Sequence, residues 1–463
     1  MPDASKYSHF LTATSLRLRE QFLFPPECSE LELQSLWFSG ALGRSFTTTT
    51  GKTVEIIQFG HWNHSAGPDF TDTAIALDGQ RLKGAIELDT DVRDWEHHRH
   101  SINPDYNQVI LHIFFSAPDN ATAFTRSSDH RDIPQIKLDP ATLTDLFDLP
   151  RFEADAHLGR CATPLQDMPD DHIESLLVAA AKHRLTLKGR RLHRSAEIHG
   201  PDEALFQGIA QTLGYRPNKL SMTILAQRLP LRILQSHGPL EGDAILLGSA
   251  GFLESESARY DSTPPEARDY LKSLWELWWK QRSHFAPAED RRLPWTLSGN
   301  RPGNHPQRRI AALALIAARW DRLKRTLRDP ASFSEDQFRS FFHKLDHPFW
   351  SHHYTLKADP ADKPVALVGP SRIDDLLANQ IYPYLIEDVP DLWTQYAKLP
   401  AKLDNVRLKR ALTRLFGTHP RRESFAKKVY QQQALLQIYQ DFCLEDDSAC
   451  QDCPFPEQLR QWR

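Results

Sequence analysis

The sequence predicts an α+β protein, in which a small region of mixed helices and strands comes first and a long, mainly helical region follows. In the first region, residues 74–77 and 81–89 have the composition of strands and flank Asp78-Gly79, a dipeptide that favours a two-residue hairpin turn. In the second region, apolar residues recur at the spacing of helices that bury one face. Examples are Ile173, Leu176, Leu177 and Ala180, and again Ile310, Leu313, Ala314 and Ala317.

Further elements surround the predicted hairpin. Ser29 and Glu32 have the spacing of a capping box and stand just ahead of an apolar run, which predicts an N-terminal helix. We expect a strand over 54–59 before the hairpin, a short helix over 94–100 after it, and another strand over 108–116. The predicted order of elements is therefore α-β-β-β-α-β.

The strand signals fade beyond Pro150, so we expect a boundary near residue 155 that divides the chain into domains 1–155 and 156–463. With 463 residues and 40% hydrophobic content, the chain is long enough for two or three packed cores. No run approaches the roughly 20 apolar residues that a membrane span needs, and the first residues lack the pattern of a secretory signal. We therefore expect a cytoplasmic protein with no membrane partner.

Three carboxylates at the predicted hairpin are the strongest candidates for a functional site. Alternate side chains of a strand share a face, so Lys83, Glu87 and Asp89 are expected on one side. Asp69, shortly before the first strand of the hairpin, can join them. Such a group of carboxylates favours Mg²⁺ or Mn²⁺, which keep bound water for a phosphate substrate. The pattern predicts metal-assisted phosphodiester hydrolysis, in which the ion activates water and neutralises charge.

Several histidines close in sequence to the hairpin are candidates for a general base or for metal ligands. They are His97, His98, His100 and His112. His97 and His100 are three residues apart and would share one face if 94–100 is helical. One of Lys83, His97 or His100 is expected to orient the attacking water. For each histidine taken singly, a structural or surface role is also open.

The chain has 56 basic and 60 acidic residues and a net charge of −4, so a polyanion would have to bind to a local basic patch. Basic residues gather in 182–194 and in 301–309. The expected contacts to nucleic acid are Lys188, Arg190, Arg191, Arg301 and Arg308. A solvated helix face explains either patch as well, and a helix-packing corner also suits 301–311. Nucleic acid is thus a possible partner, and no protein partner is indicated.

Four of the five cysteines form a candidate metal site. Cys443, Cys450 and Cys453 have the spacing C-x6-C-x2-C, and Cys161 stands alone where the helical region begins. If the fold brings them together, they are suitable ligands for Zn²⁺ or for an iron–sulfur cluster. The other interpretation is a set of small buried thiols in a C-terminal turn. Cys28 is most simply an unrelated thiol.

The order of elements resembles the restriction-endonuclease-like core of the PD-(D/E)XK nuclease superfamily. In that superfamily the aspartate of the PD pair and the glutamate of the E-x-K strand bind the metal, and the lysine acts on the water. Pro68-Asp69 and Glu87 match this pattern, whereas residue 89 is Asp in place of the lysine.

This departure leaves two alternatives to an active nuclease. One is a nuclease-like fold without catalysis that serves as a binding module for nucleic acid or protein. The other is a structural hairpin in which Asp69 caps a turn and Glu87 pairs with an arginine such as Arg309.

A second resemblance covers nearly the whole chain. The motifs that carry it are N-x-x-x-GPDF (63–70), DW-x-x-H-x-H (94–100), YN-x-V-I-L-H (106–112), LLGSAGFL (246–253), RPGNHPQRRIA (301–311), SRIDDLL (371–377) and the terminal cysteines. They are similar to an uncharacterised bacterial family, domain-of-unknown-function family 2851. That resemblance implies no activity, so the expectation of a metal-dependent nuclease comes from the residues themselves.

Overall fold

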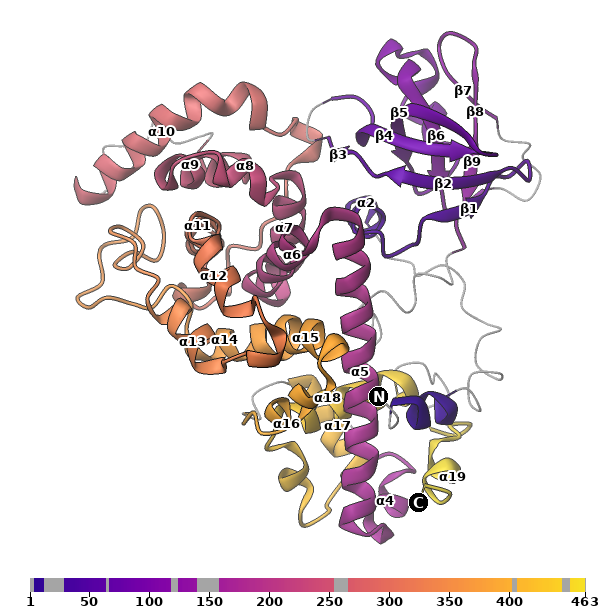
Figure 1. Ribbon diagram of the computed structural model, residues 1–463, viewed down its shortest axis with the longest axis vertical. Coiled ribbons are helices and arrows are strands. Elements are labelled where there is room, and N and C mark those ends of the chain that lie inside the picture. Colours follow the sequence, from indigo (N-terminus) through magenta and orange to yellow (C-terminus); the bar gives the residue numbers. More distant parts are fainter. Residues whose placement is uncertain are drawn as a thin grey trace. The chain divides into compact units, whose positions relative to one another are not determined.

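The computed structural model describes most of the chain, and its contacts group the residues into two compact units (Figure 1). The described residues are 4–11, 29–63, 66–117, 124–139, 158–253, 265–401, 406–443 and 450–462. The larger unit contains 26–143 and 193–376, and the smaller unit contains 1–25, 144–192 and 377–463. The boundary expected near residue 155 lies outside the described residues. Within those residues, no helix combines the length and the apolar composition that crossing a membrane would require.

The larger unit opens with the predicted N-terminal helix, α2 (Glu30–Phe38). Its capping box is present: the Ser29 hydroxyl accepts the Glu32 N–H, and the Glu32 carboxylate accepts the Ser29 N–H, each at 3.3 Å. These bonds satisfy backbone donors that the start of a helix otherwise leaves unpaired. Leu33, Trp37 and Phe38 are buried, so the apolar face of α2 anchors the helix in the core.

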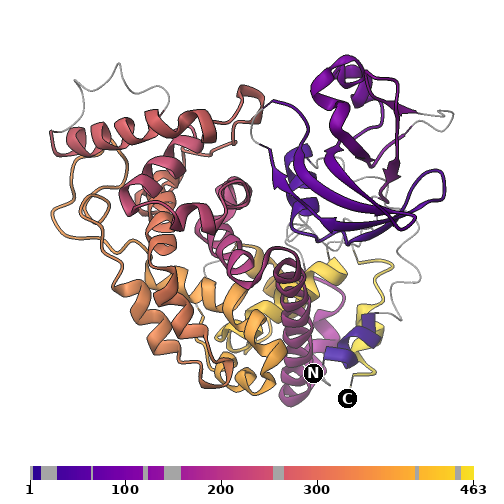
Figure 2. The ribbon, with the colours of Figure 1, turned by 45° about the horizontal axis from the view of Figure 1, so that its top comes forward.

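A curled sheet follows α2, and Figure 2 shows its strands curving around one another. Its strands are β1 (Ser45–Thr47), β2 (Thr53–Gln58), β3 (His61–Trp62), β4 (Phe70–Leu77), β5 (Gln80–Leu88), β6 (Val109–Phe114) and β9 (Gln135–Lys137). In the described part of the chain the order is β1-β2-β4-β5-β6-β9, and β3 pairs with β4. The pairs from β1 to β5 are antiparallel, whereas β6 runs parallel to both β5 and β9. A separate pair is formed by β7 (Thr125–Arg126) and β8 (Asp132–Ile133).

The β4–β5 hairpin has the turn that the sequence predicts. Asp78 and Gly79 both have positive φ, at 46° and 82°, which is what a primed two-residue turn requires. The first strand is longer than predicted, because it begins at Phe70 rather than at 74. Asp69 therefore stands directly beside the paired backbone of β5.

Because β5 and β6 are parallel, the chain must cross over between them. The crossover contains α3 (Asp94–His97), η1 (His100–Ile102) and η2 (Pro104–Gln108). The predicted helix over 94–100 is shorter in the structure, where α3 ends at His97. Arg99 has a left-handed φ of 61°, which the α-helix cannot continue through. Trp95 and Tyr106 of the crossover pack edge to face over the sheet, in a buried cluster with Ala85.

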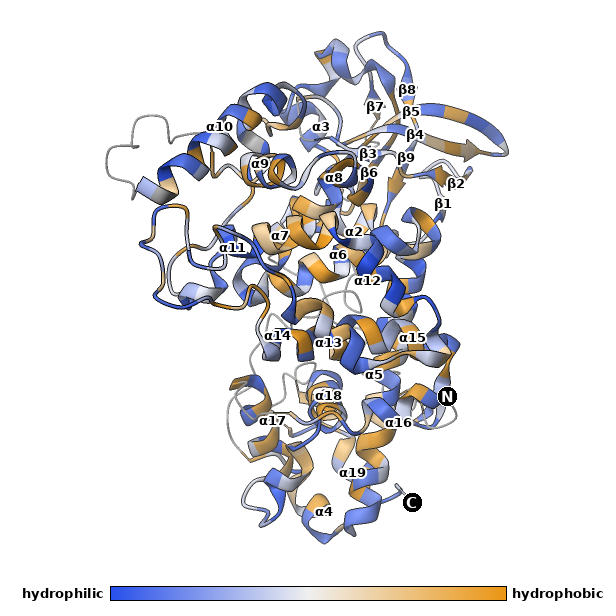
Figure 3. Cartoon of the chain, turned by 60° about the vertical axis from the view of Figure 1, so that its left-hand side comes forward, coloured by the Kyte–Doolittle hydropathy of each residue, from blue (hydrophilic) through white to orange (hydrophobic). Residues whose placement is uncertain are grey.

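The rest of the larger unit is helical, as predicted. Its main helices are α6 (Pro201–Leu213), α7 (Tyr215–Arg228), α8 (Leu231–Gln235), α9 (Pro239–Ser249), α10 (Pro265–Phe285), α11 (Pro306–Ala318), α12 (Trp320–Leu327), α13 (Glu335–His343) and α14 (Pro370–Leu376). Figure 3 shows the apolar residues of α6 and α7, which pack against each other in the core. A short turn, η5 (Glu289–Arg291), lies between α10 and α11.

The segment 301–311 forms the helix-packing corner that the sequence allowed. Pro306 begins α11, and Arg308 is buried, with 1% of its surface exposed. The Arg308 guanidinium donates to backbone carbonyls between residues 350 and 366, at 2.7 to 3.2 Å. The expectation that Arg308 contacts nucleic acid is therefore corrected, because its donors are used inside the core.

The smaller unit is helical and brings early and late parts of the chain together. Its helices are α4 (Ala162–Asp167), α5 (Asp170–His199) up to residue 192, α15 (Tyr382–Asp388), α16 (Trp393–Tyr396), α17 (Val406–Phe416), α18 (Val429–Ile438) and α19 (Phe455–Leu459). Residues 4–11 are also helical. The Phe10 ring packs against Phe442, Phe455 and Trp462, so residues near both termini share one core.

Candidate functional site

Two of the predicted acidic residues meet across the β4–β5 pair. The Asp69 N–H donates to Glu87 Oε2 at 2.9 Å, and the Leu88 N–H donates to Asp69 Oδ2 at 3.1 Å. Asp89 follows directly after β5, on the same side of the strand as Glu87, because side chains alternate. All three carboxylates are buried, with 1 to 4% of their surface exposed.

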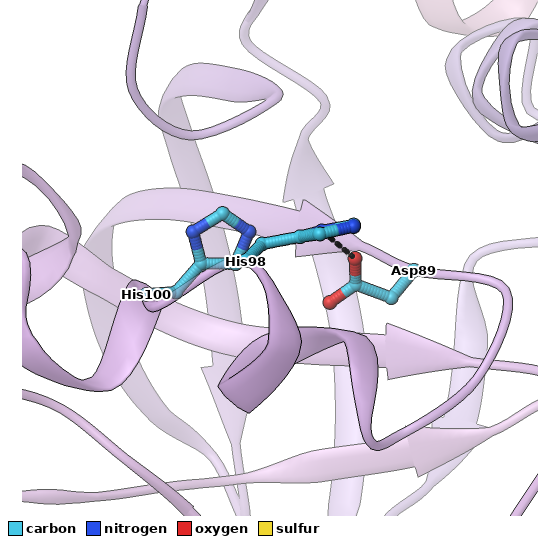
Figure 4. Close-up of side chains that lie close together, drawn as sticks. All are labelled: Asp89, His98 and His100. Carbon is cyan, nitrogen blue, oxygen red and sulfur yellow. Dashed lines mark ion pairs between the residues drawn. The ribbon is translucent and has the colours of Figure 1, made fainter.

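Histidines from two elements face these carboxylates. His100 Nε2 lies 3.3 Å from Glu87 Oε1, and His98 Nδ1 lies 3.6 Å from Asp89 Oδ1. His112 of β6 approaches Asp89 from the other side, with 3.0 Å between Nε2 and Oδ2. Figure 4 shows Asp89 with the two crossover histidines, whose ligand atoms lie within 4.8 Å of one another. This spacing allows the three groups to bind one metal ion.

His112 is held at both ring nitrogens. Its Nδ1 is hydrogen-bonded to the Thr125 hydroxyl, and the Gln135 amide donates to that same hydroxyl at 2.7 Å. A hydroxyl that accepts from Gln135 has its own proton to donate to His112 Nδ1. The Nε2 of His112 then has the proton that Asp89 accepts. Thr125 of β7 and Gln135 of β9 thus orient His112, and His112 in turn orients Asp89.

Burial makes the carboxylates hard to ionise. It is the largest cause that raises the pKa of Asp69 to about 6 and the pKa of Asp89 to about 7. Burial also raises the pKa of Glu87 well above its ordinary value, and repulsion from Asp69 and Asp89 adds to this rise. Burial is thus the main obstacle to ionising the three carboxyl groups, and their mutual repulsion is secondary.

The buried histidines do not offset this charge. Burial lowers the pKa of His100 and of His112 to about 3, so both imidazoles are neutral near pH 7. A neutral imidazole can hold a metal ion or accept a proton. His98 is more accessible, since 49% of its side chain is exposed. The site is therefore closed around Asp89 and open toward solvent at His98.

Arg291 belongs to the site and was not predicted. Its Nη1 lies 3.3 Å from Asp69 Oδ1 and donates to the Asn63 carbonyl at 2.8 Å, while Nη2 donates to the Gly67 carbonyl at 2.7 Å. The guanidinium thus clamps the turn that leads into Asp69. No local pattern connects Arg291 with the hairpin, since 224 positions separate it from Gly67.

Glu30, the first residue of α2, was also missed. Glu30 is exposed at the edge of the site, and loss of solvation there, together with the charges of Asp69 and Asp89, raises its pKa to about 7. Gln34, one turn later, donates to Glu30 Oε1 at 2.8 Å and also hydrogen-bonds to Asp69. In the sequence, Glu30 showed only the acidic first turn that many helices have.

Two predicted water-orienting residues lie away from this cluster. His97 is 67% exposed and pairs with Asp94 at 3.6 Å. The expectation that His97 and His100 share a helical face is wrong, because α3 ends at His97. Lys83 is exposed on β5, and within the described residues it forms no ion pair with the three carboxylates. Of the candidates named for this role, only His100 contacts a carboxylate of the cluster.

The predicted structural pairing of Glu87 with Arg309 is wrong. Arg309 is buried elsewhere and donates to the Leu367 carbonyl at 2.6 Å. Asn63 stabilises the turn before Asp69 through its amide, which donates to the carbonyls of Ala66 and Pro68. His64 and Cys28 lie outside the described residues.

The predicted basic patches are partly used for packing. Lys188 donates to Asn379 at 2.6 Å and to Gln433 at 2.8 Å, within the smaller unit. Arg191 is half-buried, whereas Arg190 and Arg301 are exposed. Each patch therefore offers only some of its charges to a polyanion. The four candidate metal-binding cysteines, in contrast, are all buried in the smaller unit.

Comparison with known proteins places the site inside a family. A family described as "Protein of unknown function (DUF2851)" matches residues 30–394. The matched range begins at Glu30 and includes the acidic hairpin, the histidines and Arg291. No curated protein and no solved structure matches the chain.

Proposed function

Since the chain belongs to the DUF2851 family, whose description assigns no activity, we propose from the site alone that it is a metal-dependent phosphodiester hydrolase acting on nucleic acid. Asp69, Glu87 and Asp89 form the acidic part of its metal site. The buried His100 and the more exposed His98 complete the ligand set.

The observation that supports this proposal is the gathering of several carboxyl groups around a single guanidinium. The four carboxyl groups of Glu30, Asp69, Glu87 and Asp89 act on one another, while Arg291 brings one guanidinium to Asp69. The two most buried histidines are neutral. A divalent cation among these groups would stabilise the ionised carboxylates, which burial and, to a smaller extent, mutual repulsion otherwise disfavour.

The donor atoms favour Mn²⁺ over Mg²⁺. Asp89, His98 and His100 combine carboxylate oxygen with imidazole nitrogen. Mg²⁺ prefers oxygen ligands in near-ideal octahedral geometry, whereas imidazole suits transition metals. Glu87, 3.3 Å from His100, is close enough to act as a further ligand.

Each protein group then has a role in the reaction. A divalent ion supplies water activation and charge neutralisation at the phosphodiester. Glu30, at the edge of the site and with a pKa of about 7, accepts a proton near neutral pH and takes the place of the absent lysine. His112 orients Asp89, and Arg291 orients Asp69 by holding its turn.

The strand order also supports a nuclease-like core. The elements α2, β2, β4, β5, α3 and β6 follow the order α-β-β-β-α-β, with an antiparallel hairpin and a parallel last strand. Asp69 and Glu87 stand at the positions where the PD-(D/E)XK pattern has its metal ligands. The restriction-endonuclease-like topology is therefore part of the proposal.

The first test is metal binding and cleavage by the full chain. Purified protein is titrated with Mn²⁺ at pH 7.5 and incubated with single-stranded DNA, duplex DNA and RNA. We expect Mn²⁺-dependent cleavage of at least one substrate, and loss of cleavage with a chelator. Asp89→Asn is expected to bind Mn²⁺ on the order of 100-fold more weakly and to lose cleavage.

The matched control is Asp72→Asn, which changes an aspartate of β4 whose side chain is 78% exposed. This variant should keep both properties. Equal Mn²⁺ affinity in wild type and Asp89→Asn would refute the metal site. Mn²⁺ binding and nucleic-acid binding without any cleavage would instead favour the alternative of an inactive binding module.

A further inference from the structure

Four cysteines far apart in the sequence gather in the smaller unit. Cys161 stands before α4, Cys443 ends a π-helical turn after α18, and Cys450 and Cys453 lie just ahead of α19. The helices that position them are neighbours, since α4 contacts both α17 and α19 (Figure 1). All four thiols are buried, with 5 to 8% of their surface exposed, and no disulfide joins them in the described part of the chain.

Contacts made by the sulfur atoms bring the four cysteines together: Cys453 Sγ donates to the carbonyl of Phe442, the neighbour of Cys443, at 3.9 Å, and Arg414 contacts both Cys161 and Cys450. A site of four thiols also requires that the fold brings residue 161 close to residue 450. Arg160 contributes to this by donating to the carbonyls of Cys450 and Gln451 at 3.0 and 2.8 Å.

A buried cation lies among these sulfurs. Arg414 of α17 is 1% exposed, and its Nη2 donates to Cys450 Sγ at 2.8 Å. Its backbone carbonyl accepts from Cys161 Sγ at 3.7 Å. A guanidinium keeps its charge inside a protein, so Arg414 brings a positive charge to these sulfurs. A buried charge requires partners, and thiolate sulfurs that bind a metal are suitable ones.

The spacing of the sulfurs indicates which metal group they bind. Among the described residues, no three of these sulfurs lie within 4.8 Å of one another. A tetrahedral Zn²⁺ with bonds of about 2.3 Å would hold its four sulfurs about 3.8 Å apart. The wider spacing of these sulfurs favours a cluster over a single zinc ion as the group that they bind.

We propose that Cys161, Cys443, Cys450 and Cys453 ligate a [4Fe–4S] cluster, and that Arg414 donates hydrogen bonds to its sulfur ligands. The cluster fastens the segment before α5 to the C-terminal segment. Cys450 has a left-handed φ of 79°, an uncommon backbone state for a residue other than glycine. This proposal involves the smaller unit and does not depend on the hydrolase proposed for the larger one.

The decisive measurement is metal analysis of the full chain after anaerobic purification. We expect about four iron atoms and four acid-labile sulfides per chain, together with the broad visible absorbance of a cluster. Stoichiometric zinc without iron would overturn the cluster. Four reactive thiols and no metal, even after anaerobic reconstitution with iron and sulfide, would overturn the whole site.

Two variants extend the test. Cys453→Ser should lose the iron and the visible absorbance, while Cys28→Ser, the remaining cysteine of the chain, should keep both. If Cys453→Ser does not fold, the iron and sulfide content of the wild-type chain still tests the proposed cluster. Arg414→Gln keeps all four ligands but removes a positive charge, so we expect the iron content to remain and the reduction potential to fall. An unchanged potential would contradict the position of Arg414 beside the cluster.

Discussion

Asp89 is the residue on which the electrostatics of the acidic site depend most. It is buried, it contacts His98 and His112, and burial raises its pKa to about 7. A carboxyl with a raised pKa binds its proton more tightly in the folded protein than in the unfolded chain. Its contribution to stability is therefore present at low pH and is lost as the pH rises through the folded pKa.

For the metal-free protein, we expect Asp89→Asn to gain stability relative to wild type as the pH rises from about 4 to about 7. Asparagine does not titrate, whereas Asp89 must ionise in a buried site over this range. The relative gain should be on the order of 4 kcal/mol, from a shift of about three pKa units. Urea unfolding in a chelator at several pH values measures it, and a difference that is constant with pH would contradict it.

A second prediction concerns Arg291, whose guanidinium contacts Asp69 and two backbone carbonyls. Arg291→Gln leaves a buried carboxylate without its cation, so we expect a loss of roughly 3 kcal/mol in unfolding free energy at pH 7.5. Arg292→Gln, which changes the exposed neighbour, should cost far less. Urea denaturation compares the two, and equal stability of both variants would show that the clamp is unimportant.

These residues show how far sequence can predict the site. Glu87 and Asp89 were found because strand alternation alone places them on one side of β5. His98 was not preferred over His97, because the left-handed Arg99 that reorients the crossover has no local sequence signal. Glu30 and Arg291 were missed because only tertiary packing brings them to Asp69.

At the scale of elements, the packing of α9 against α10 depends on one missing side chain. A Cβ built on Gly248 would lie 2.1 Å from the ring of Trp278, which is buried. A Cβ on Gly242, in the same helix, would meet nothing within 4 Å. The packing of α9 against α10 therefore requires a glycine at position 248 but not at position 242.

We therefore expect Gly248→Ala to destabilise the protein by about 1 to 3 kcal/mol, because the two helices must separate or the indole must shift. Gly242→Ala should stabilise it by up to about 1 kcal/mol, since alanine favours a helix over glycine. Thermal or urea unfolding of the two variants measures both effects. Destabilisation of similar size by both would indicate that the contact with Trp278 is not the cause.

Elements with a strong local signal were predicted well. The capping box of α2 and the Asp78-Gly79 turn both act through neighbouring residues, and both are present. The strands β7, β8 and β9 were not predicted, because they are only two or three residues long and show no alternation. β9 is held by its pairing with β6, and β7 and β8 pair with each other, so a local pattern is not required.

At the scale of the molecule, the two units are built from interleaved stretches of chain, which local patterns do not reveal. The sequence predicted a mixed region followed by helices, and this order is present. It gave no indication that residues 4–11 pack beside the C-terminal segment, because such contacts depend on aromatic residues far apart in the chain.

A metal ion at the proposed site should stabilise the larger unit. At 100 times its dissociation constant, Mn²⁺ should add about 2.7 kcal/mol to the unfolding free energy. Hydrogen exchange with mass detection should show slower exchange in β4 and β5, and unchanged exchange in α17 and α18. Protection of α17 and α18 alone would place the ion at the cysteines instead.

The packing of Phe10 against Phe442, Phe455 and Trp462 has a consequence for biosynthesis. Residues 4–11 are synthesised long before residues 455–462. The helix of residues 4–11 therefore cannot make these aromatic contacts until the late residues have left the ribosome. The larger unit is made of residues up to 376, so all of its chain has been synthesised while translation of the rest continues. The smaller unit closes last, when the final cysteine and the aromatic residues after it have emerged.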